Sequence, residues 1–295
     1  HGDGTGDILD AVIAHFEQEP APADLEAGET EATPNAFSIA IIGRPNVGKS
    51  SLFNQLVGED RAVVHDMPGT TRDSIDTIVE GEWGQLRFVD TAGMRRVSRI
   101  DEGTEYYSLV RALQALDLAD GALLVIDATE GVTAQDQRLA ERLDASGNAA
   151  VIVLNKWDLL DTEAREKCRE DVGRKLAFLG YAPVMSVCAA SGKNVNRLIP
   201  ALIEAREAYR RRIPTGELNR VLGEAQRRHA APPDRGRRPK IMYGTQGAVD
   251  PPTFTLFSNG TIAPTYLRYI ERCLREAFDI GPTPIKLRVR RRGDN

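Results

Sequence analysis

One short stretch, residues 43–50, limits most strongly what this chain can fold into. It reads Gly-Arg-Pro-Asn-Val-Gly-Lys-Ser, follows the apolar run 37–42 and precedes a helical pattern at 51–57. A strand, such a loop and a helix in this order form a phosphate-binding loop, because backbone N–H groups and the helix N-terminus converge on the phosphate. The alternative, an ordinary turn before a helix, is disfavoured because both flanking elements are present.

The loop predicts specific contacts to a bound nucleotide. Lys49 is expected to reach the β- and γ-phosphates, and the Ser50 hydroxyl is expected to ligate Mg²⁺. The full set of predicted phosphate-contacting residues is Gly43, Arg44, Pro45, Asn46, Val47, Gly48, Lys49, Ser50 and Ser51.

Strand-like and helical patterns alternate from residue 37 to about 212. The apolar runs are SIAII, TIVEGEW, LRFVD, ALLVIDA, AVIVLNK and APVMSV, and helical patterns lie near 48–58, 103–118, 133–147, 163–180 and 195–211. This alternation predicts an α/β fold with a mostly parallel sheet covered by helices on both faces. TIVEGEW and LRFVD are separated by only a turn, so we expect an antiparallel pair at the sheet edge. Ligand loops are expected at the carboxyl ends of the strands.

Two polar motifs bear on Mg²⁺ and the γ-phosphate. Asp90-Thr91-Ala92-Gly93 follows a predicted strand, where a carboxylate opposite a phosphate loop can hold Mg²⁺ directly or through a water. Gly93 allows a backbone N–H to approach the γ-phosphate closely. Earlier in the chain, Pro-Gly-Thr-Thr-Arg-Asp at 68–73 carries two threonines, of which Thr71 is the favoured Mg²⁺ ligand. A plain turn is the alternative for 68–73.

The motif Asn155-Lys156-Trp157-Asp158 follows the apolar run 151–154 and predicts base recognition. A carboxylate at Asp158 can accept hydrogen bonds from the ring N–H and the exocyclic amine of guanine, an edge that adenine lacks. The motif therefore predicts selection of GTP over ATP. Lys156 can lie along the base plane, and Asn155 can connect this loop to the phosphate loop.

Charge is distributed unevenly along the chain. Residues 210–295 hold 18 Lys+Arg and 8 Asp+Glu, a net charge of +10, while the total is −5. A basic C-terminal part on an acidic body favours a polyanionic partner such as nucleic acid, the alternative being a solvated charged surface. Three cysteines without Cys-x-x-Cys spacing and the lack of a membrane span or signal peptide predict a cytoplasmic protein.

Residues 1–36 precede this alternation. Residues 1–18 show one amphipathic helix pattern, and residues 19–36 have the acidic, Pro- and Ala-rich composition of a flexible linker. Residues 1–13 align without a gap on residues 191–203, which carry the last turn and helix pattern of the α/β unit. We therefore expect 1–18 to be the residual C-terminal helix of a preceding copy of the domain, with chance similarity as the alternative.

The motifs GRPNVGKSS, PGTTRD, DTAGMRR and NKWD, together with KIMYGTQ, PPTFTLF and YLRYIERCLREAF near the C-terminus, resemble the EngA (Der) bacterial GTPases. The resemblance implies a Ras-like fold, GTP hydrolysis, a role in maturation of the large ribosomal subunit, and two tandem GTPase domains before a KH-like domain. It places a GTPase domain at 37–212 and a KH-like domain at 213–295. It also implies that Cys188-Ala189, where many members have Ser-Ala, contacts the base largely through backbone N–H groups.

The position after Asp-x-x-Gly often carries a Gln that orients the attacking water, but here it is Met94, which cannot do so. The resemblance suggests instead a K⁺ held partly by Asn46; Arg95 and Arg96 are internal alternatives. The expected catalytic residues are Lys49, Asn46, Thr71 and Gly93. Two other functions stay open: a guanine-nucleotide-binding scaffold with negligible turnover, and the GTPase module of a tRNA-modifying or membrane transport protein.

The basic part is expected to fold as strand, strand, helix and strand after a Pro/Arg-rich link at 231–239. The helix is predicted near 264–278, with Tyr266 in the core. The peptide 244–247, Gly-Thr-Gln-Gly, looks like a KH Gly-x-x-Gly loop but lies between strand-like runs, so we predict a connecting loop. The basic residues of the last strand are expected to contact rRNA phosphates in a salt-dependent way; they are Lys286, Arg288, Arg290, Arg291 and Arg292.

Overall fold

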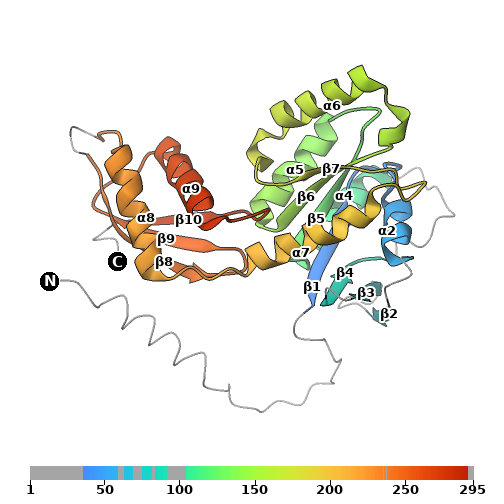
Figure 1. Ribbon diagram of the computed structural model, residues 1–295, viewed down its shortest axis with the longest axis horizontal. Helices are drawn as coiled ribbons and strands as arrows, with labels where there is room; N and C mark the ends of the chain where they lie inside the picture. The colour runs from blue at the N-terminus through green and yellow to red at the C-terminus, as the bar shows by residue number, and fades with distance from the viewer. Residues whose placement is uncertain are drawn as a thin grey trace, which may run out of the picture.

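The computed structural model describes residues 36–58, 63–68, 75–81, 84–91, 104–234, 236 and 238–291. These residues form two α/β units side by side, one with a seven-stranded sheet and one with a three-stranded sheet (Figure 1). This is the predicted fold class. Within the described ranges, no helix has the length and apolar character needed to cross a membrane.

The larger sheet has the strand order β2-β3-β4-β1-β5-β6-β7. β1 pairs in parallel with β4 and β5, and β5, β6 and β7 continue in parallel. Every residue of β1, β5 and β6 is buried, as expected for parallel strands with helices on both faces. The strands are β1 (Phe37–Ile42), β2 (Val63–Pro68), β3 (Ile75–Gly81), β4 (Gly84–Phe88), β5 (Gly121–Asp127), β6 (Ala149–Asn155) and β7 (Val184–Ser186).

In the described part of the chain, five α-helices cover the two faces of this sheet. Alternate residues of β1 show the division: Ile39 and Ile41 pack with α2 and α7, whereas Ala40 and Ile42 pack with α4, α5 and α6. Both predicted layers are therefore confirmed. The helices are α2 (Lys49–Val57), α4 (Thr104–Asp117), α5 (Ala134–Ser146), α6 (Thr162–Lys175) and α7 (Leu198–Tyr209), with short 3-10 turns η1 (Trp157–Leu159), η2 (Ala177–Leu179) and η3 (Val195–Arg197).

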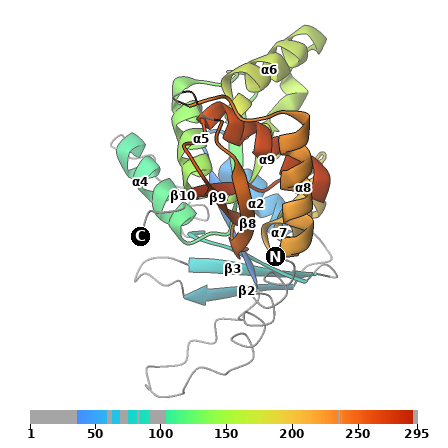
Figure 2. The same cartoon turned by 90° about the vertical axis from the view of Figure 1, so that its left-hand side faces the viewer.

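The sheet extends one strand beyond the sequence prediction. The expected antiparallel pair is present as β3 and β4, but the edge of the sheet is β2, which pairs with β3 from Val63↔Glu80 to Pro68↔Ile75 (Figure 2). The sequence of β2, VVHDMP, lacks a period of two, so its pattern gave no strand signal. Pro68 is tolerated because it lies at the end of an edge strand.

The smaller unit has the strand order β10-β9-β8, with β9 and β10 parallel and β8 and β9 antiparallel. Its core joins one face of this sheet to two helices through Leu222, Leu256 and Ile270, among others. The predicted helix at 264–278 is confirmed, whereas α8 was not predicted. The elements are α8 (Thr215–Arg228), β8 (Ile241–Ala248), β9 (Thr253–Ser258), α9 (Pro264–Phe278) and β10 (Lys286–Arg291).

Tyr266 on α9 is a core residue, as predicted. Its side chain is 5% exposed, and its hydroxyl donates a hydrogen bond to the carbonyl oxygen of His229 at 2.6 Å. The neighbouring Tyr269 likewise donates to the carbonyl oxygen of Ala225 at 3.0 Å. Both hydroxyls therefore tie α9 to the C-terminal end of α8.

The peptide 244–247 is not the connecting loop that we predicted, because it lies inside β8. Gln246 is buried; its side-chain oxygen accepts from the Ile213 N–H at 2.7 Å, and its amide donates to the Arg211 carbonyl oxygen at 2.9 Å. A Cβ on Gly244 would lie 2.8 Å from Leu222, so this glycine allows α8 to approach the sheet closely. Gly244 therefore serves packing, whereas Gly247 lies where the register of β8 on β9 shifts, between Gln246 and Ala248.

The two units meet at the amino ends of the parallel strands. The Ala150 N–H, near the start of β6, donates to the Pro282 carbonyl oxygen at 3.3 Å, and Lys286 Nζ donates to the Ser146 carbonyl oxygen at 3.1 Å. Because β6 runs from this joint to Asn155, the smaller unit and the predicted base-reading loop lie at opposite ends of one strand.

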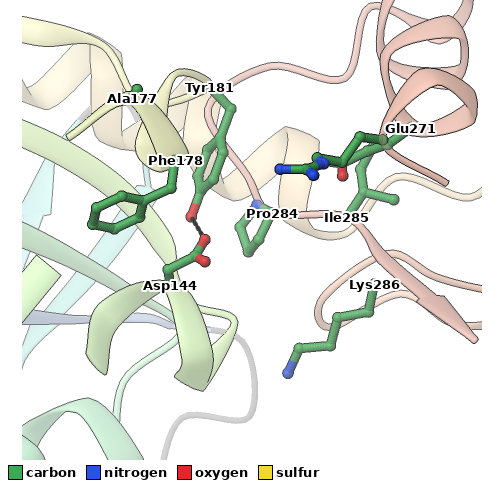
Figure 3. A pocket seen from close by; sticks show the side chains of 9 residues that line it. Asp144, Ala177, Phe178, Tyr181, Glu271, Pro284, Ile285 and Lys286 are labelled. Carbon is green, nitrogen blue, oxygen red and sulfur yellow. Dashed lines mark hydrogen bonds between the residues drawn. The ribbon is translucent and has the colours of Figure 1, made fainter. Parts of the chain in front are cut away.

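A cleft of about 670 Å³ lies at this joint. Tyr181 and Asp144 line it on the side of the larger unit, and Glu271 and Lys286 line it on the side of the smaller unit (Figure 3). The Tyr181 hydroxyl donates to Asp144 at 3.2 Å, and the Arg275 guanidinium lies 5.0 Å from the centre of the Tyr181 ring. The cleft is thus part of the contact between the units and is remote from the nucleotide loops.

Candidate nucleotide site

The parallel strands bring the predicted loops to one edge of the larger sheet. β1, β4, β5 and β6 all end there, so the segments that follow Ile42, Phe88, Asp127 and Asn155 start side by side. The phosphate loop, the segment of Asp90 and the base-reading loop are three of these four segments. Their common origin is the geometric basis of the candidate site.

The phosphate loop folds as the sequence predicts. Gly43, Asn46 and Gly48 have φ values of 154°, 62° and 99°, which turn successive backbone N–H groups inward. α2 starts at Lys49 without a side-chain cap and without an acidic residue in its first turn. Its positive end is therefore uncompensated and is suited to a phosphate.

Of the other predicted loop residues, Val47 is buried, whereas Pro45 and Asn46 are exposed at the loop tip. Ser50 is partly exposed in the first turn of α2, and Ser51 is exposed.

The Lys49 side chain crosses the phosphate loop. Its ammonium group donates to the carbonyl oxygens of Gly43 at 2.9 Å and Arg44 at 2.6 Å. Burial disfavours the charged form and lowers the pKa of Lys49 to about 8. A bound phosphate supplies the opposite charge that this ammonium lacks, so binding of an anion is expected to raise the pKa again.

We expect nucleotide binding to take up a proton in mildly alkaline solution. As pH rises toward and above the pKa of about 8, the free protein binds fewer protons than the complex, so the proton uptake on binding increases and affinity falls. Titration calorimetry with Mg-GDP in two buffers of different ionisation enthalpy measures this uptake. Lys49→Arg, which keeps its charge, is the control; equal uptake by both proteins contradicts the assignment.

Asn155 joins three segments of the site. Its side-chain amide donates to the Val47 carbonyl oxygen at 2.8 Å, and its side-chain oxygen accepts from the Ala189 N–H at 2.9 Å. Both bonds are buried, so each is costly to break. The predicted connection between the base-reading loop and the phosphate loop is present, and it also includes the loop of Ala189.

Cys188 and Ala189 hold the residues that are expected to read the base. The Cys188 N–H donates to the Lys193 carbonyl oxygen at 3.0 Å, and the Ala189 N–H is used by Asn155. A hydrogen bond with the Cys188 side chain is the main cause that lowers the pKa of Asp158. Both backbone N–H groups are thus engaged within the protein, and the thiol helps to keep Asp158 ionised as a hydrogen-bond acceptor.

Asp127, the last residue of β5, belongs to the site but was missed in the sequence. The Lys156 ammonium donates to Asp127 at 2.5 Å, and the Thr129 hydroxyl donates to it at 2.6 Å. Burial acts to raise the pKa of Asp127, but these hydrogen bonds outweigh it and lower the pKa. The pair fixes Lys156 at the sheet edge. Its position in the sequence could have indicated this role. Asp127 is the last residue of β5, which lies between β1, the strand before Gly43, and β6, the strand that ends with Asn155.

Arg44 is anchored away from the centre of the phosphate loop. Its guanidinium contacts Asp136 at 3.1 Å and Glu130 at 2.8 Å. Asp136 is fully buried and also forms a capping box with Thr133 at the start of α5. Arg44 therefore connects the loop to α5, a role that residue spacing did not reveal.

Asp90 lies at the predicted edge with φ at 52°, and its N–H donates to Asp76 at 3.2 Å. The Thr91 hydroxyl is buried and lies 3.0 Å from that of Thr77. These contacts hold the segment against β3. The other predicted residues of the γ-phosphate side lie outside the described residues: Thr71, Ala92 and Gly93, as well as Met94, Arg95 and Arg96.

Comparisons with known proteins match both units. A family model described as 50S ribosome-binding GTPase matches residues 38–156, and one described as KH-domain-like of EngA bacterial GTPase enzymes, C-terminal, matches residues 212–290. GTPase Der of Desulforudis audaxviator is 44% identical over 291 residues, which are 97% of this chain and 64% of that protein. GTPase Der of Symbiobacterium thermophilum is 45% identical over 99% of this chain and 61% of that protein. The chain thus spans less than two thirds of these relatives.

Proposed function

We propose that this chain, which belongs to the EngA (Der) family of bacterial GTPases, is a GTP-hydrolysing switch that acts in assembly of the large ribosomal subunit. The observation that carries the proposal is the double hydrogen bond of Asn155, because it unites the phosphate loop with both segments of the predicted base site. Asp158, at the end of the same motif, supplies the acceptor for the guanine edge.

Mg²⁺ fits the residues available near the phosphate loop. Ser50 and Asp90 offer a hydroxyl and a carboxylate, the oxygen donors that this ion prefers, and Thr71 is the third proposed ligand. The ion, when bound, neutralises charge on the β- and γ-phosphates. Lys49 adds a positive charge from the protein, and the Gly93 N–H is proposed to contact the γ-phosphate.

We expect slow GTP turnover that is faster in KCl than in NaCl. Met94 cannot orient the attacking water. The positive charge that an arginine finger supplies in other GTPases is proposed to come here from K⁺ near Asn46, which is exposed at the tip of the phosphate loop. Phosphate release from Mg-GTP at equal ionic strength should be faster in KCl than in NaCl. ATP, which lacks the guanine edge, is the negative control.

The two salts also separate this proposal from its main alternative. Equal rates in KCl and NaCl remove the K⁺ site but leave GTP hydrolysis standing. Tight GTP binding without turnover in either salt favours instead a guanine-nucleotide-binding scaffold. Arg95 and Arg96 become the candidates for the positive charge if turnover is insensitive to K⁺.

The proposed partner is ribosomal RNA or the large ribosomal subunit, bound through the basic unit. We place the boundary of the two domains between residues 212 and 213, where the core of the smaller unit begins with Ile213. Residues 1–18 are proposed to end a preceding GTPase domain, with 19–36 as the linker; both lie outside the described residues. All three cysteines, Cys168, Cys188 and Cys273, are unpaired, which agrees with a reducing compartment such as the cytoplasm.

A further inference from the structure

Among the residues that the structure describes, helices cover one face of the three-stranded sheet and no helix covers the other. The covered face includes Phe254 and Leu256 of β9 together with Leu287 and Val289 of β10, which pack with α8 and α9 (Figure 1). Because side chains alternate along a strand, the residues between these point to the other side. We call that side the open face; by register it carries Tyr243 and Thr245 of β8, Thr255 and Phe257 of β9, and Arg288 and Arg290 of β10.

An aromatic platform lies at the centre of the open face. The rings of Tyr243 and Phe257 are stacked, with centroids 4.4 Å apart and planes at 13°. Tyr243 is 47% exposed, so much of its ring is accessible to a ligand. A stacked pair of rings of which Tyr243 is exposed and Phe257 partly exposed is a surface on which a further planar ring can stack.

Two arginines flank this platform. Arg290 pairs in register with Phe257, and Arg288 pairs with Thr255 two residues earlier, so both reach the open face beside the rings. Both side chains are exposed, and within the described part of the chain neither has an ion-pair partner. Lys286 differs, because its ammonium is bound to the Ser146 carbonyl oxygen at the joint.

The open face carries positive charge without nearby acidic side chains on its own strands. The acidic residues of 238–291 are Asp250 in the turn after β8, Glu271 and Glu276 on α9, and Asp279 at its C-terminus. The three strands themselves contain none. A polyanion with planar rings matches both features of the face, the positive charge and the exposed aromatic ring.

We propose that the open face binds single-stranded RNA, with an unpaired base stacked on the Tyr243–Phe257 platform and backbone phosphates contacted by Arg288 and Arg290. The inference rests on the proposed function, in which the partner is RNA, and identifies the form of RNA and the surface. Single strands are selected because a paired base offers no free ring face to the platform. Residues 244–247 are part of β8 and therefore do not form a Gly-x-x-Gly loop that clamps RNA. The open face is proposed to bind RNA in place of such a loop.

Fluorescence anisotropy with a labelled single-stranded 12-nucleotide RNA of mixed sequence tests the proposal on the full chain. Tyr243→Ala should weaken binding about tenfold, within the range measured for loss of one stacked base, whereas Tyr243→Phe should stay within about twofold of the parent. Arg288→Ala and Arg290→Ala should each reduce the salt slope by about 0.7. Arg227→Ala on α8 removes the same charge outside the open face and is the matched control.

The outcomes separate the inference from the function on which it rests. Equal RNA binding by Tyr243→Ala and the parent, or equal weakening by Arg290→Ala and Arg227→Ala, overturns the open face as the RNA site. Preference for a duplex of the same sequence overturns the stacking mode. If Tyr243→Ala instead abolishes self-association in sedimentation without an effect on RNA, the face binds protein and the inference is wrong. GTP turnover measured in parallel reports on the proposed function independently.

Discussion

Asp158→Asn is expected to reduce affinity for GTP by on the order of 100-fold and to transfer preference to xanthosine triphosphate. Asn offers one acceptor and one donor where Asp158 offers two acceptors, so one N–H of the guanine edge loses its partner. Xanthine carries a carbonyl oxygen in place of the guanine amine, and the amide of Asn can donate to it. Competition between labelled GDP and unlabelled GTP or xanthosine triphosphate measures the exchange of preference.

The control for this substitution is Glu163→Gln. Glu163 lies in the first turn of α6, is exposed and loses the same charge, but it follows the motif by five residues and is not placed in the base site. We expect it to bind GTP as the parent does. If Asp158→Asn also binds GTP as the parent does, Asp158 does not read the base, and the chain recognises the nucleotide through its phosphates alone.

The parts of the site that could be predicted are those in which position along a strand determines position in space. Lys49, Asp90 and Asn155 each follow an apolar run, and parallel strands bring their carboxyl ends to one edge. The link from Asn155 to the phosphate loop could be predicted because both segments start at that edge. Helices with strong apolar spacing, such as α9, were predicted for the same kind of local reason.

The parts that were missed depend on pairing between distant residues. Arg44 and Asp136 are 92 positions apart, and Gln246 meets Ile213 across 33 positions. Neither pair produces a periodic pattern in the sequence. A particular carboxylate or amide acquires its structural role only when the fold buries it beside its partner. α8 is a different case: Leu218, Val221, Leu222 and Ala225 have helical spacing and could have been recognised.

Gly48→Ala is expected to unfold the larger unit more easily and to lower nucleotide affinity by about 100-fold or more. Gly48 has φ at 99°, which strains any other residue, and an added Cβ would collide with the amide nitrogen of Asn155. Moving Asn155 breaks its bonds to Val47 and Ala189 and leaves buried groups unpaired. The strain and the lost bonds together should destabilise the unit by about 3 kcal/mol.

Thermal unfolding followed by circular dichroism measures the first effect, and a loss of about 3 kcal/mol lowers the midpoint by roughly 10 °C in a domain of this size. Gly173→Ala is the matched control, because a Cβ added to Gly173 within α6 would meet no atom within 4 Å, and alanine there should stabilise the helix by about 0.5–1 kcal/mol. An unchanged midpoint and affinity for Gly48→Ala would mean that Asn155 can be displaced without cost. The loops would then be joined by something other than its two hydrogen bonds, and the site proposed around them would lose its structural basis.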